Sequence, residues 1–415
     1  MPASTDQIGF GPFSMDLAAT RLFRDGVDLK LRPQAFHALK ALARNSGRYI
    51  DYERMIQEAW DGTWVSRHTV DVTIQEVRKV LNEYSAWIVR GKLGYCLEVP
   101  PSDELIRKGW HFWNRRSREG FEKALGCFEQ AALQHSTDFR AYEGLSLCYL
   151  TLASFGMRAP KEMHRGFLEA HGRAVALVGM TPELRSSRAH GLHIFEHKKE
   201  EAEAELLEAR RENPNLAIVH ERLTLLYTGQ ARFEDALQAL EQARGVDPLW
   251  PMLPATEAFV YVCRREFERG VVCGKRAVEL HPYLHSSRAF YAQALEYSGR
   301  MQEALEQYHL AAVMFPDFHW LPALEATCLA RSGRPAEAEQ LLRALEQTRA
   351  SEYVDAYAVA MLQAALGRPD EAFRELERAI EENSSVLFIL DVDPKLDALR
   401  ADPRFAPLRD KLFGV

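Results

Sequence analysis

The feature that most constrains this chain is a sequence pattern that returns every 34 residues through its second half. A small residue recurs near the start of each unit, and a second one stands seven residues later with one exception. Because a single unit cannot bury its hydrophobic face alone, neighbouring units must stack. The small residues are Ala202, Ala236, Gly270, Ala304, Ala338 and Ala372, followed by Ala209, Ala243, Ala277, Ala311 and Ala379, with Leu345 as the exception.

Each unit is predicted to be a pair of antiparallel helices. Small side chains let two helices approach closely, and a proline such as Pro214 or Pro248 stops the second helix. Gly299, Gly333 and Gly367 mark the turn that precedes a second helix. The pattern resembles the tetratricopeptide repeat, and this resemblance implies an α-helical solenoid.

Two less regular units are expected upstream of the strict repeat. Residues 114–136 supply a second helix, and residues 139–179 form a helix pair with a longer internal loop. The end of the chain contains two Asp-Pro breaks and is predicted to cap the array. We therefore expect a solenoid over 101–384 and a capping segment over 385–415.

A helical solenoid offers a concave surface lined by its first helices. The positions that usually face inward are mostly apolar, with Glu221 among them, which favours a groove for a protein or a small molecule. The alternative is that the superhelix packs on itself or on a second copy as a homodimer. The groove residues are predicted to be Ile218, Leu225, Met252, Phe259, Tyr297, Trp320, Tyr357 and Met361.

The first hundred residues follow a different pattern. Short strands are expected over 10–32, with a turn at Asp25-Gly26. Helices are predicted over 33–50, ending near Gly47, and over 51–60, capped by Asp51. Ser66 can cap a third helix, which runs to about Asn82, and a hairpin joins 87–89 to 95–99.

The third helix carries an apolar stripe and an opposite polar face. At about 100° per residue, Val70, Ile74, Val77 and Leu81 share the side that should be buried. The opposite side collects His68, Val72, Gln75 and Lys79. An exposed valine can meet a thymine methyl group in a DNA major groove, and glutamine can read adenine.

These features resemble the OmpR/PhoB-type winged-helix DNA-binding domain, which implies a boundary near residue 100. The match is carried by residues 31–42, 47–48 and 53–60, the third helix, and the hairpin glycines. The resemblance implies that the third helix enters the major groove and that the hairpin is a wing. The family usually has basic residues where Gln75 and Glu76 stand. The expected DNA contacts are Arg67, His68, Thr69, Val72, Gln75, Glu76, Arg78 and Lys79 in the helix, and Arg90, Gly91, Lys92 and Tyr95 in the wing.

The composition fits this organisation. With 415 residues, the chain is too long for one compact core. The N-terminus lacks the features of a signal peptide, and no apolar stretch is long enough for a transmembrane helix, so a cytoplasmic location without a membrane partner is expected. The fold is predicted to be mainly α, with an α+β winged helix-turn-helix over 1–100 followed by the solenoid.

The sequence lacks the motifs of common enzymes, and no metal or cofactor is predicted. His190, His193 and His197 could share a helix face, but the repeat register favours packing positions. Together these expectations indicate a sequence-specific DNA-binding regulator whose solenoid senses a partner or mediates oligomerisation. The alternative is a non-catalytic protein-interaction scaffold whose winged helix no longer binds DNA.

Overall fold

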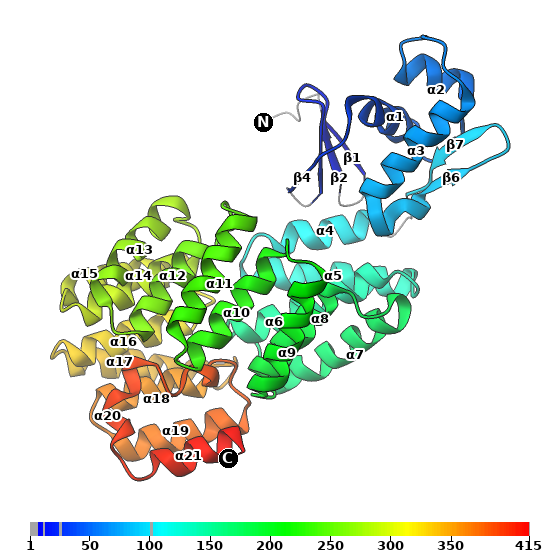
Figure 1. Ribbon diagram of the computed structural model, residues 1–415. Coiled ribbons are helices and arrows are strands. Elements are labelled where there is room, and N and C mark those ends of the chain that lie inside the picture. Colours follow the sequence, from blue (N-terminus) through cyan, green and yellow to red (C-terminus); the bar gives the residue numbers. More distant parts are fainter. Residues whose placement is uncertain (1–6, 11–12, 25–26, 100–102, 415) are drawn as a thin grey trace. The chain divides into compact units, whose positions relative to one another are not determined.

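The computed structural model describes the chain except residues 1–6, 11–12, 25–26, 100–102 and 415. The chain divides into two compact units (Figure 1). The first, called the N-terminal unit, comprises residues 1–111 with 133–135. The second, called the repeat unit, comprises residues 112–132 and 136–415.

The N-terminal unit opens with a four-stranded antiparallel sheet in the order β1-β2-β3-β4, as the alternating pattern predicts. Met15 pairs with Leu22 across the sheet, and both side chains are fully buried. The predicted turn at Asp25-Gly26 lies outside the described residues. The strands are β1 (Gln7–Phe10), β2 (Phe13–Asp16), β3 (Arg21–Arg24) and β4 (Val27–Leu29).

Three helices follow, and the N-caps predicted for the second and third are confirmed. The Asp51 side chain accepts a hydrogen bond from the Arg54 amide, and the Ser66 side chain accepts one from the Thr69 amide. The first helix ends at Arg44, earlier than predicted, and Gly47 follows in a left-handed turn with φ 77°. The helices are α1 (Pro33–Arg44), α2 (Tyr52–Ala59) and α3 (Arg67–Leu81).

A 3-10 helix and a second small sheet complete the N-terminal unit. The sheet has the order β5-β7-β6, so the wing hairpin β6–β7 is anchored to a strand that precedes α2. The apolar stripe of α3 lies in the core with no exposed surface, as predicted. These elements are β5 (Ile50–Asp51), η1 (Asn82–Trp87), β6 (Ile88–Arg90) and β7 (Gly94–Leu97).

The repeat unit is built from pairs of antiparallel helices that stack in chain order (Figure 1). The first helices of successive pairs contact one another, from α6 through α8 to α18. Helix α4 (Asp103–Trp113), most of which belongs to the N-terminal unit, and helix α5 (Arg118–Gln134) precede the pairs. The pairs are α6 (Phe139–Ser154) with α7 (Pro160–Val178), α8 (Pro182–Ile194) with α9 (Lys199–Glu212), α10 (Ala217–Gly229) with α11 (Phe233–Val246), α12 (Leu253–Cys263) with α13 (Phe267–Leu280), α14 (His285–Tyr297) with α15 (Met301–Met314), α16 (Trp320–Arg331) with α17 (Pro335–Thr348), and α18 (Ala356–Ala365) with α19 (Pro369–Glu381).

The 34-residue period is confirmed by where the second helices begin. Helices α9, α11, α13, α15, α17 and α19 start at residues 199, 233, 267, 301, 335 and 369. The recurring small residues are all buried between the paired helices. The turn within each pair is left-handed, with φ 58° at Ala231, 69° at Arg265 and 85° at Gly299. Glycine removes the Cβ cost of this turn in four of these seven pairs, at Gly156, Gly299, Gly333 and Gly367, while His197, Ala231 and Arg265 bear it in the other three.

The C-terminal segment differs from a simple end cap. The Ser385 hydroxyl donates a 2.9 Å hydrogen bond to the Ala153 carbonyl on α6. The Arg265 side chain donates to the Val392 carbonyl at 2.6 Å, and the Tyr357 hydroxyl donates to Asp393 at 3.1 Å. The segment therefore runs along the inner side of the array. Its elements are η2 (Leu387–Ile389), η3 (Pro394–Leu396), α20 (Asp397–Arg400) and α21 (Phe405–Phe413).

Candidate functional site

The outward face of α3 is open to solvent. His68, Val72, Gln75 and Lys79 are exposed, and Val72 keeps 49% of its surface accessible. Among the residues that the structure describes, none forms an ion pair with Lys79 or with Lys92 on the wing. The Val72 side chain, the Gln75 amide and the unpaired ammonium groups of Lys79 and Lys92 are therefore accessible for contact on α3 and the wing.

Asp71 fixes the wing against α3. The hydroxyls of Tyr52 and Tyr95 each donate to the Asp71 carboxylate at 2.7 Å, and Arg90 donates to it at 2.9 Å. Burial alone would raise the pKa of Asp71, but the two tyrosine hydrogen bonds and the Arg90 charge outweigh it and lower this pKa. Residues from α2, α3, β6 and β7 thus meet at one carboxylate. The sequence showed Asp71 only as a polar neighbour of the exposed face.

Two of the predicted DNA contacts are turned inward. Tyr95 is 1% exposed, because its ring packs in the core and its hydroxyl is held by Asp71. Arg78 is half-buried, donates to the Ile88 carbonyl at 2.6 Å and lies over the Tyr95 ring. Both side chains join α3 to the wing. The prediction that Tyr95 contacts DNA directly is corrected because this side chain is buried, whereas a DNA contact by the half-exposed Arg78 stays a prediction.

Glu76 is paired within the N-terminal unit. The Arg32 side chain, just before α1, donates to both oxygens of the Glu76 carboxylate at 2.9 and 2.8 Å. The Arg32 hydrogen bond lowers the pKa of Glu76 despite partial burial. The charge of this carboxylate is therefore compensated by Arg32, and a direct contact of Glu76 with DNA stays a prediction. Nothing in the sequence spacing indicated this partner, which lies 44 residues away.

The remaining predicted residues lie at the ends of α3 and the wing. Arg67 lies over the Tyr52 ring at 5.2 Å, and the Thr69 hydroxyl bonds to the capping Ser66. Gly91 allows the Tyr49 ring to approach, since a Cβ at this position would lie 2.6 Å from it. The Arg90 side chain is 58% exposed although one nitrogen binds Asp71.

The predicted groove exists in part. A cavity of about 440 Å³ within the repeat unit is lined by Glu221 and by five of the eight predicted groove residues. Tyr357 and Met361 are fully buried, and the Tyr357 hydroxyl donates to Asp393 of the C-terminal segment. Tyr297 instead lies beneath the Arg331 guanidinium, stacked against Phe267. The prediction that Tyr297, Tyr357 and Met361 line the groove is therefore corrected. The five lining residues are Ile218, Leu225, Met252, Phe259 and Trp320.

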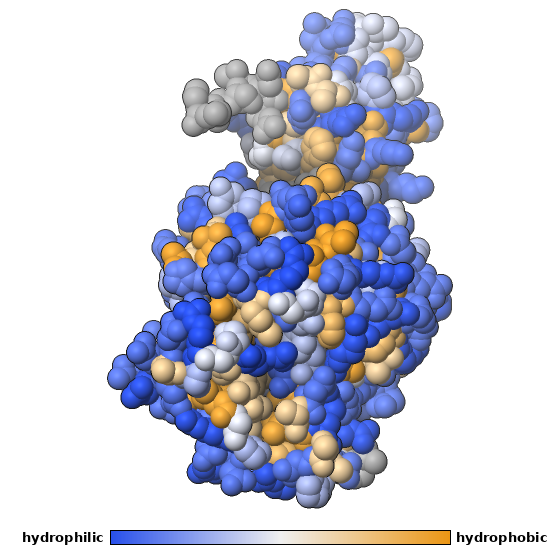
Figure 2. Space-filling view, turned by 90° about the vertical axis from the view of Figure 1, so that its left-hand side faces the viewer, coloured by the Kyte–Doolittle hydropathy of each residue, from blue (hydrophilic) through white to orange (hydrophobic). Residues whose placement is uncertain are grey.

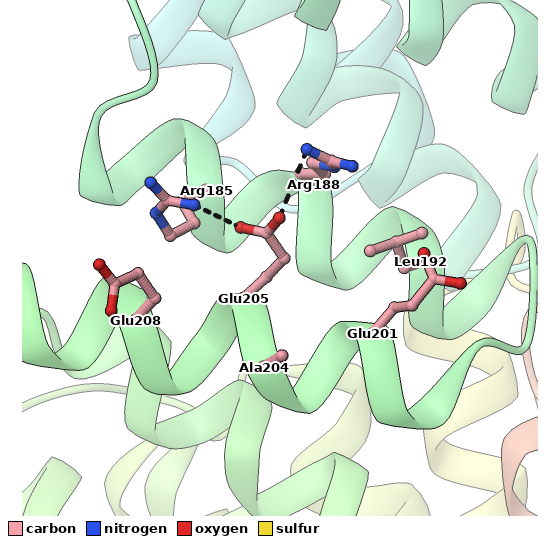
Figure 3. Close-up of a pocket in the computed structure, with 7 residues that line it drawn as sticks. All are labelled: Arg185, Arg188, Leu192, Glu201, Ala204, Glu205 and Glu208. Carbon is pink, nitrogen blue, oxygen red and sulfur yellow. Dashed lines mark hydrogen bonds and ion pairs between the residues drawn. The ribbon is translucent and has the colours of Figure 1, made fainter.

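A second, shallower hollow between α8 and α9 is occupied by ion pairs (Figure 3). Glu205 of α9 reaches two arginines of α8, Arg185 at 2.8 Å and Arg188 at 3.3 Å. Arg185 also binds Glu212 at 3.2 Å. These charges compensate one another and join the two helices of one repeat.

The molecular surface is mixed in polarity. Figure 2 shows hydrophobic side chains in small groups among hydrophilic ones on one face. Within the described residues, every helix is too short or too polar to cross a lipid bilayer.

Known proteins share the N-terminal part of this chain. Residues 26–97 match the family described as "Transcriptional regulatory protein, C terminal". Transcriptional regulatory protein CutR of Streptomyces coelicolor is 33% identical over 70 residues, covering 17% of this chain and 32% of the relative. Transcriptional regulatory protein SrrA of Staphylococcus aureus is 28% identical over 109 residues, covering 25% and 45%. The chain thus spans less than half the length of either relative.

Solved structures resemble the larger part of the chain. A monomeric IFIT1 mutant with m7Gppp-AAAA superposes with a TM-score of 0.52 at 16% identity, covering 79% of this chain and 84% of that one. Yeast Tom70 gives a TM-score of 0.45 at 16% identity, with 85% and 79% covered. At such identity the IFIT1 likeness concerns the fold alone. This chain carries an OmpR/PhoB-type DNA-binding domain at its N-terminus, followed by a tetratricopeptide-type helical repeat array.

Proposed function

We propose that this protein is a non-catalytic, cytoplasmic, sequence-specific DNA-binding regulator of transcription. The observation that carries the proposal is the open face of α3, with Val72, Gln75 and Lys79 beside the wing lysine Lys92. In this proposal α3 enters the major groove and the wing touches the sugar–phosphate backbone. The family match and the names of the relatives support it.

The side chains of the exposed face and the wing fall into two groups, those that can read bases and those that can bind phosphate. Val72 can meet a thymine methyl group, and Gln75 can make two hydrogen bonds to adenine. Lys79, Lys92, Arg67 and the exposed part of Arg90 can neutralise phosphates without reading sequence. The Arg32–Glu76 pair supports the proposal as well, because Arg32 compensates a carboxylate on α3 that would otherwise repel phosphate.

The repeat unit is proposed to be the sensor. Its cavity, lined by predicted groove residues, supports a small-molecule ligand, because the C-terminal segment already occupies part of the inner surface. Assembly through a second copy is the other route by which the repeats could control DNA binding.

A salt titration of the full chain against mixed-sequence duplex DNA tests the proposal. The logarithm of the affinity should fall linearly with the logarithm of salt concentration, with a slope of about −0.9 for each neutralised phosphate. Lys79→Ala should weaken binding to all sequences and reduce the slope by about 1, whereas Gln75→Ala should relax base preference. Lys161→Ala, at an exposed lysine of α7, is the matched control and should change neither.

Two results would count against this assignment. Absence of binding by the full chain even at low salt would favour the protein-interaction scaffold. If Gln75→Ala and Lys79→Ala each lowered the affinity equally for every DNA sequence, the proposal that Gln75 reads bases while Lys79 binds phosphate would be refuted.

A further inference from the structure

The cavity of the repeat unit has the size and walls of a small-molecule site. Its volume of about 440 Å³ lies within the roughly 300–1,000 Å³ typical of ligand pockets. Aromatic rings from the α6–α7 turn, from α12 and α14, from the α15–α16 loop and α16, and from the C-terminal segment form much of its lining, so it suits an apolar body. These rings belong to Phe155, Phe259, Phe290, Phe318, Trp320 and Phe388.

Two arginines line this apolar cavity without a matching carboxylate. Arg222 on α10 is 7% exposed, and one of its nitrogens donates to the Ser186 hydroxyl at 2.7 Å. Arg116, in the turn between α4 and α5, lies 3.8 Å above the Trp113 ring. Among the described residues, neither guanidinium has an ion-pair partner within 4 Å. Burial lowers the pKa of each to about 10, so both stay charged at neutral pH.

Glu221 compensates only one of these two charges. It interacts electrostatically with both arginines, and its carboxylate accepts a 2.7 Å hydrogen bond from the Trp250 indole. Around the two arginines, these two cations and one anion leave one positive charge in excess, while the rest of the lining adds Lys395 and the carboxylates of Glu143, Glu183, Asp355 and Asp393. Burial also raises the pKa of Glu221, which weakens the compensation further.

The other acidic groups that line the cavity are engaged or partly solvated. Asp393 lies 3.8 Å from Lys395 and accepts from Tyr357, and Asp355 accepts from Ser384. Glu143 and Glu183 remain half-exposed. Among the described residues, no carboxylate of the lining lies within 4 Å of the Arg116 or Arg222 guanidinium.

His285 adds a hydrogen-bonding group beside Arg116. Its ring lies 4.1 Å from Phe318 and 4.6 Å from Phe155, and within the described structure its buried Nε2 has no hydrogen-bond partner. Burial and the Arg116 charge lower the pKa of His285 to about 3, so the ring is neutral and can donate or accept one bond at this atom.

A buried charge without a partner is costly, and an incoming anion would remove that cost. We propose that this cavity binds a small amphipathic organic anion. Its apolar body lies on the aromatic walls, and its carboxylate, sulfonate or phosphate group binds Arg116 and Arg222, with His285 as a further polar contact. The inference rests on the proposed function, in which the repeat unit is the sensor.

A pair of fluorescent probes of matched shape tests the charge requirement in the full chain. One is 1-anilinonaphthalene-8-sulfonate, and the other is the uncharged N-phenyl-1-naphthylamine. Arg222→Gln and Arg116→Gln should each weaken binding of the sulfonate by about tenfold or more while leaving the neutral probe unchanged. Glu221→Gln keeps an acceptor for Trp250 and should tighten sulfonate binding, because it removes the competing carboxylate.

Two controls keep the outcome interpretable. Arg374→Gln removes an arginine that is 71% exposed on α19 and should change binding of neither probe. Circular dichroism verifies that each variant is folded. If Arg222→Gln fails to fold, Arg116→Gln, which changes a residue in a turn, still tests the proposal.

The inference is overturned if the sulfonate does not bind, if both probes respond alike to the arginine variants, or if Glu221→Gln weakens the sulfonate. Its failure is distinct from failure of the proposed function. If the protein no longer distinguishes the two probes but still binds DNA in a salt-dependent way, only the proposed ligand class is refuted. If the protein distinguishes the two probes but does not bind DNA, the proposed function as a DNA-binding regulator is refuted.

Discussion

At the scale of single residues, one carboxylate sets the position of the wing. Asp71 accepts hydrogen bonds from Tyr52, Tyr95 and Arg90, which come from three different elements. Bonds to a charged acceptor contribute more than neutral ones, and each lost partner leaves a polar group unsatisfied. The exposed face of α3 can act together with the wing because this carboxylate joins them.

Asp71→Asn should therefore loosen the wing. The substitution removes the charge that binds Arg90 and at least one tyrosine bond, so local stability should fall by about 2 kcal/mol. Hydrogen exchange measured by mass spectrometry in peptides covering β6 and β7 should be faster than in the wild type. Asp28→Asn, at an exposed residue 3.7 Å from Arg21, is the matched control. Unchanged exchange in β6 and β7 would show that Asp71 does not hold the wing.

At the scale of elements, the anchoring of the wing depends on a close approach of two strands. Asp51 of β5 pairs with Gly94 of β7. A Cβ on Gly94 would lie 1.9 Å from the Ile50 carbonyl oxygen and 2.7 Å from the Asp51 Cα, distances that no side chain can adopt. Glycine is required here because of the neighbouring backbone.

Gly94→Ala should separate β5 from β7 and cost at least about 3 kcal/mol, since the clash is with backbone rather than a movable side chain. Calorimetry of the full chain should show the N-terminal unit unfolding at a lower temperature, with the repeat unit unaffected. Gly126→Ala on α5 is the contrasting variant, because a Cβ there meets nothing within 4 Å. It should stabilise its helix by up to about 1 kcal/mol. Similar effects of the two substitutions would contradict the strand-contact explanation.

At the scale of the whole molecule, the repeat unit contains several histidines that fold in the neutral state. Burial lowers the pKa of His193 and His285 to about 3 and that of His197 to about 4. The unfolded chain binds these protons near pH 6.5, so their contribution to stability is complete above that pH and is lost as the pH falls toward 3. Asp355 has the opposite effect on the pH dependence of stability, because burial raises its pKa to about 6.

His285→Phe should reduce the acid sensitivity of the repeat unit. The ring already lies among Phe155, Phe315 and Phe318, so phenylalanine suits the site. Between pH 6.5 and 5 the variant should lose less stability than the wild type, by up to about 1.4 kcal/mol per pH unit. Urea unfolding at pH 7, 6 and 5 measures this difference. His309→Gln, at a side chain that is 70% exposed, should leave the pH dependence unchanged, and a similar change for both variants would refute the assignment.

The sequence by itself determined the features that depend on local spacing. The 34-residue period, the helix pairs, the caps at Asp51 and Ser66, and the buried stripe of α3 are all confirmed. Each follows from residues within one or two helical turns or from a repeat copied along the chain. Such patterns are visible in sequence because neighbouring residues share one geometry.

Only the tertiary structure decided which distant groups meet. The Arg32–Glu76 pair, the three partners of Asp71 and the path of the C-terminal segment over Tyr357 could not be inferred from spacing. The Ser385 to Ala153 bond joins residues 232 positions apart. Contacts within the repeat unit, such as this bond, depend on the small rotation between successive repeats, which accumulates along a solenoid and sets its curvature. Therefore the sequence indicated a groove, whereas folding determined which residues still line it.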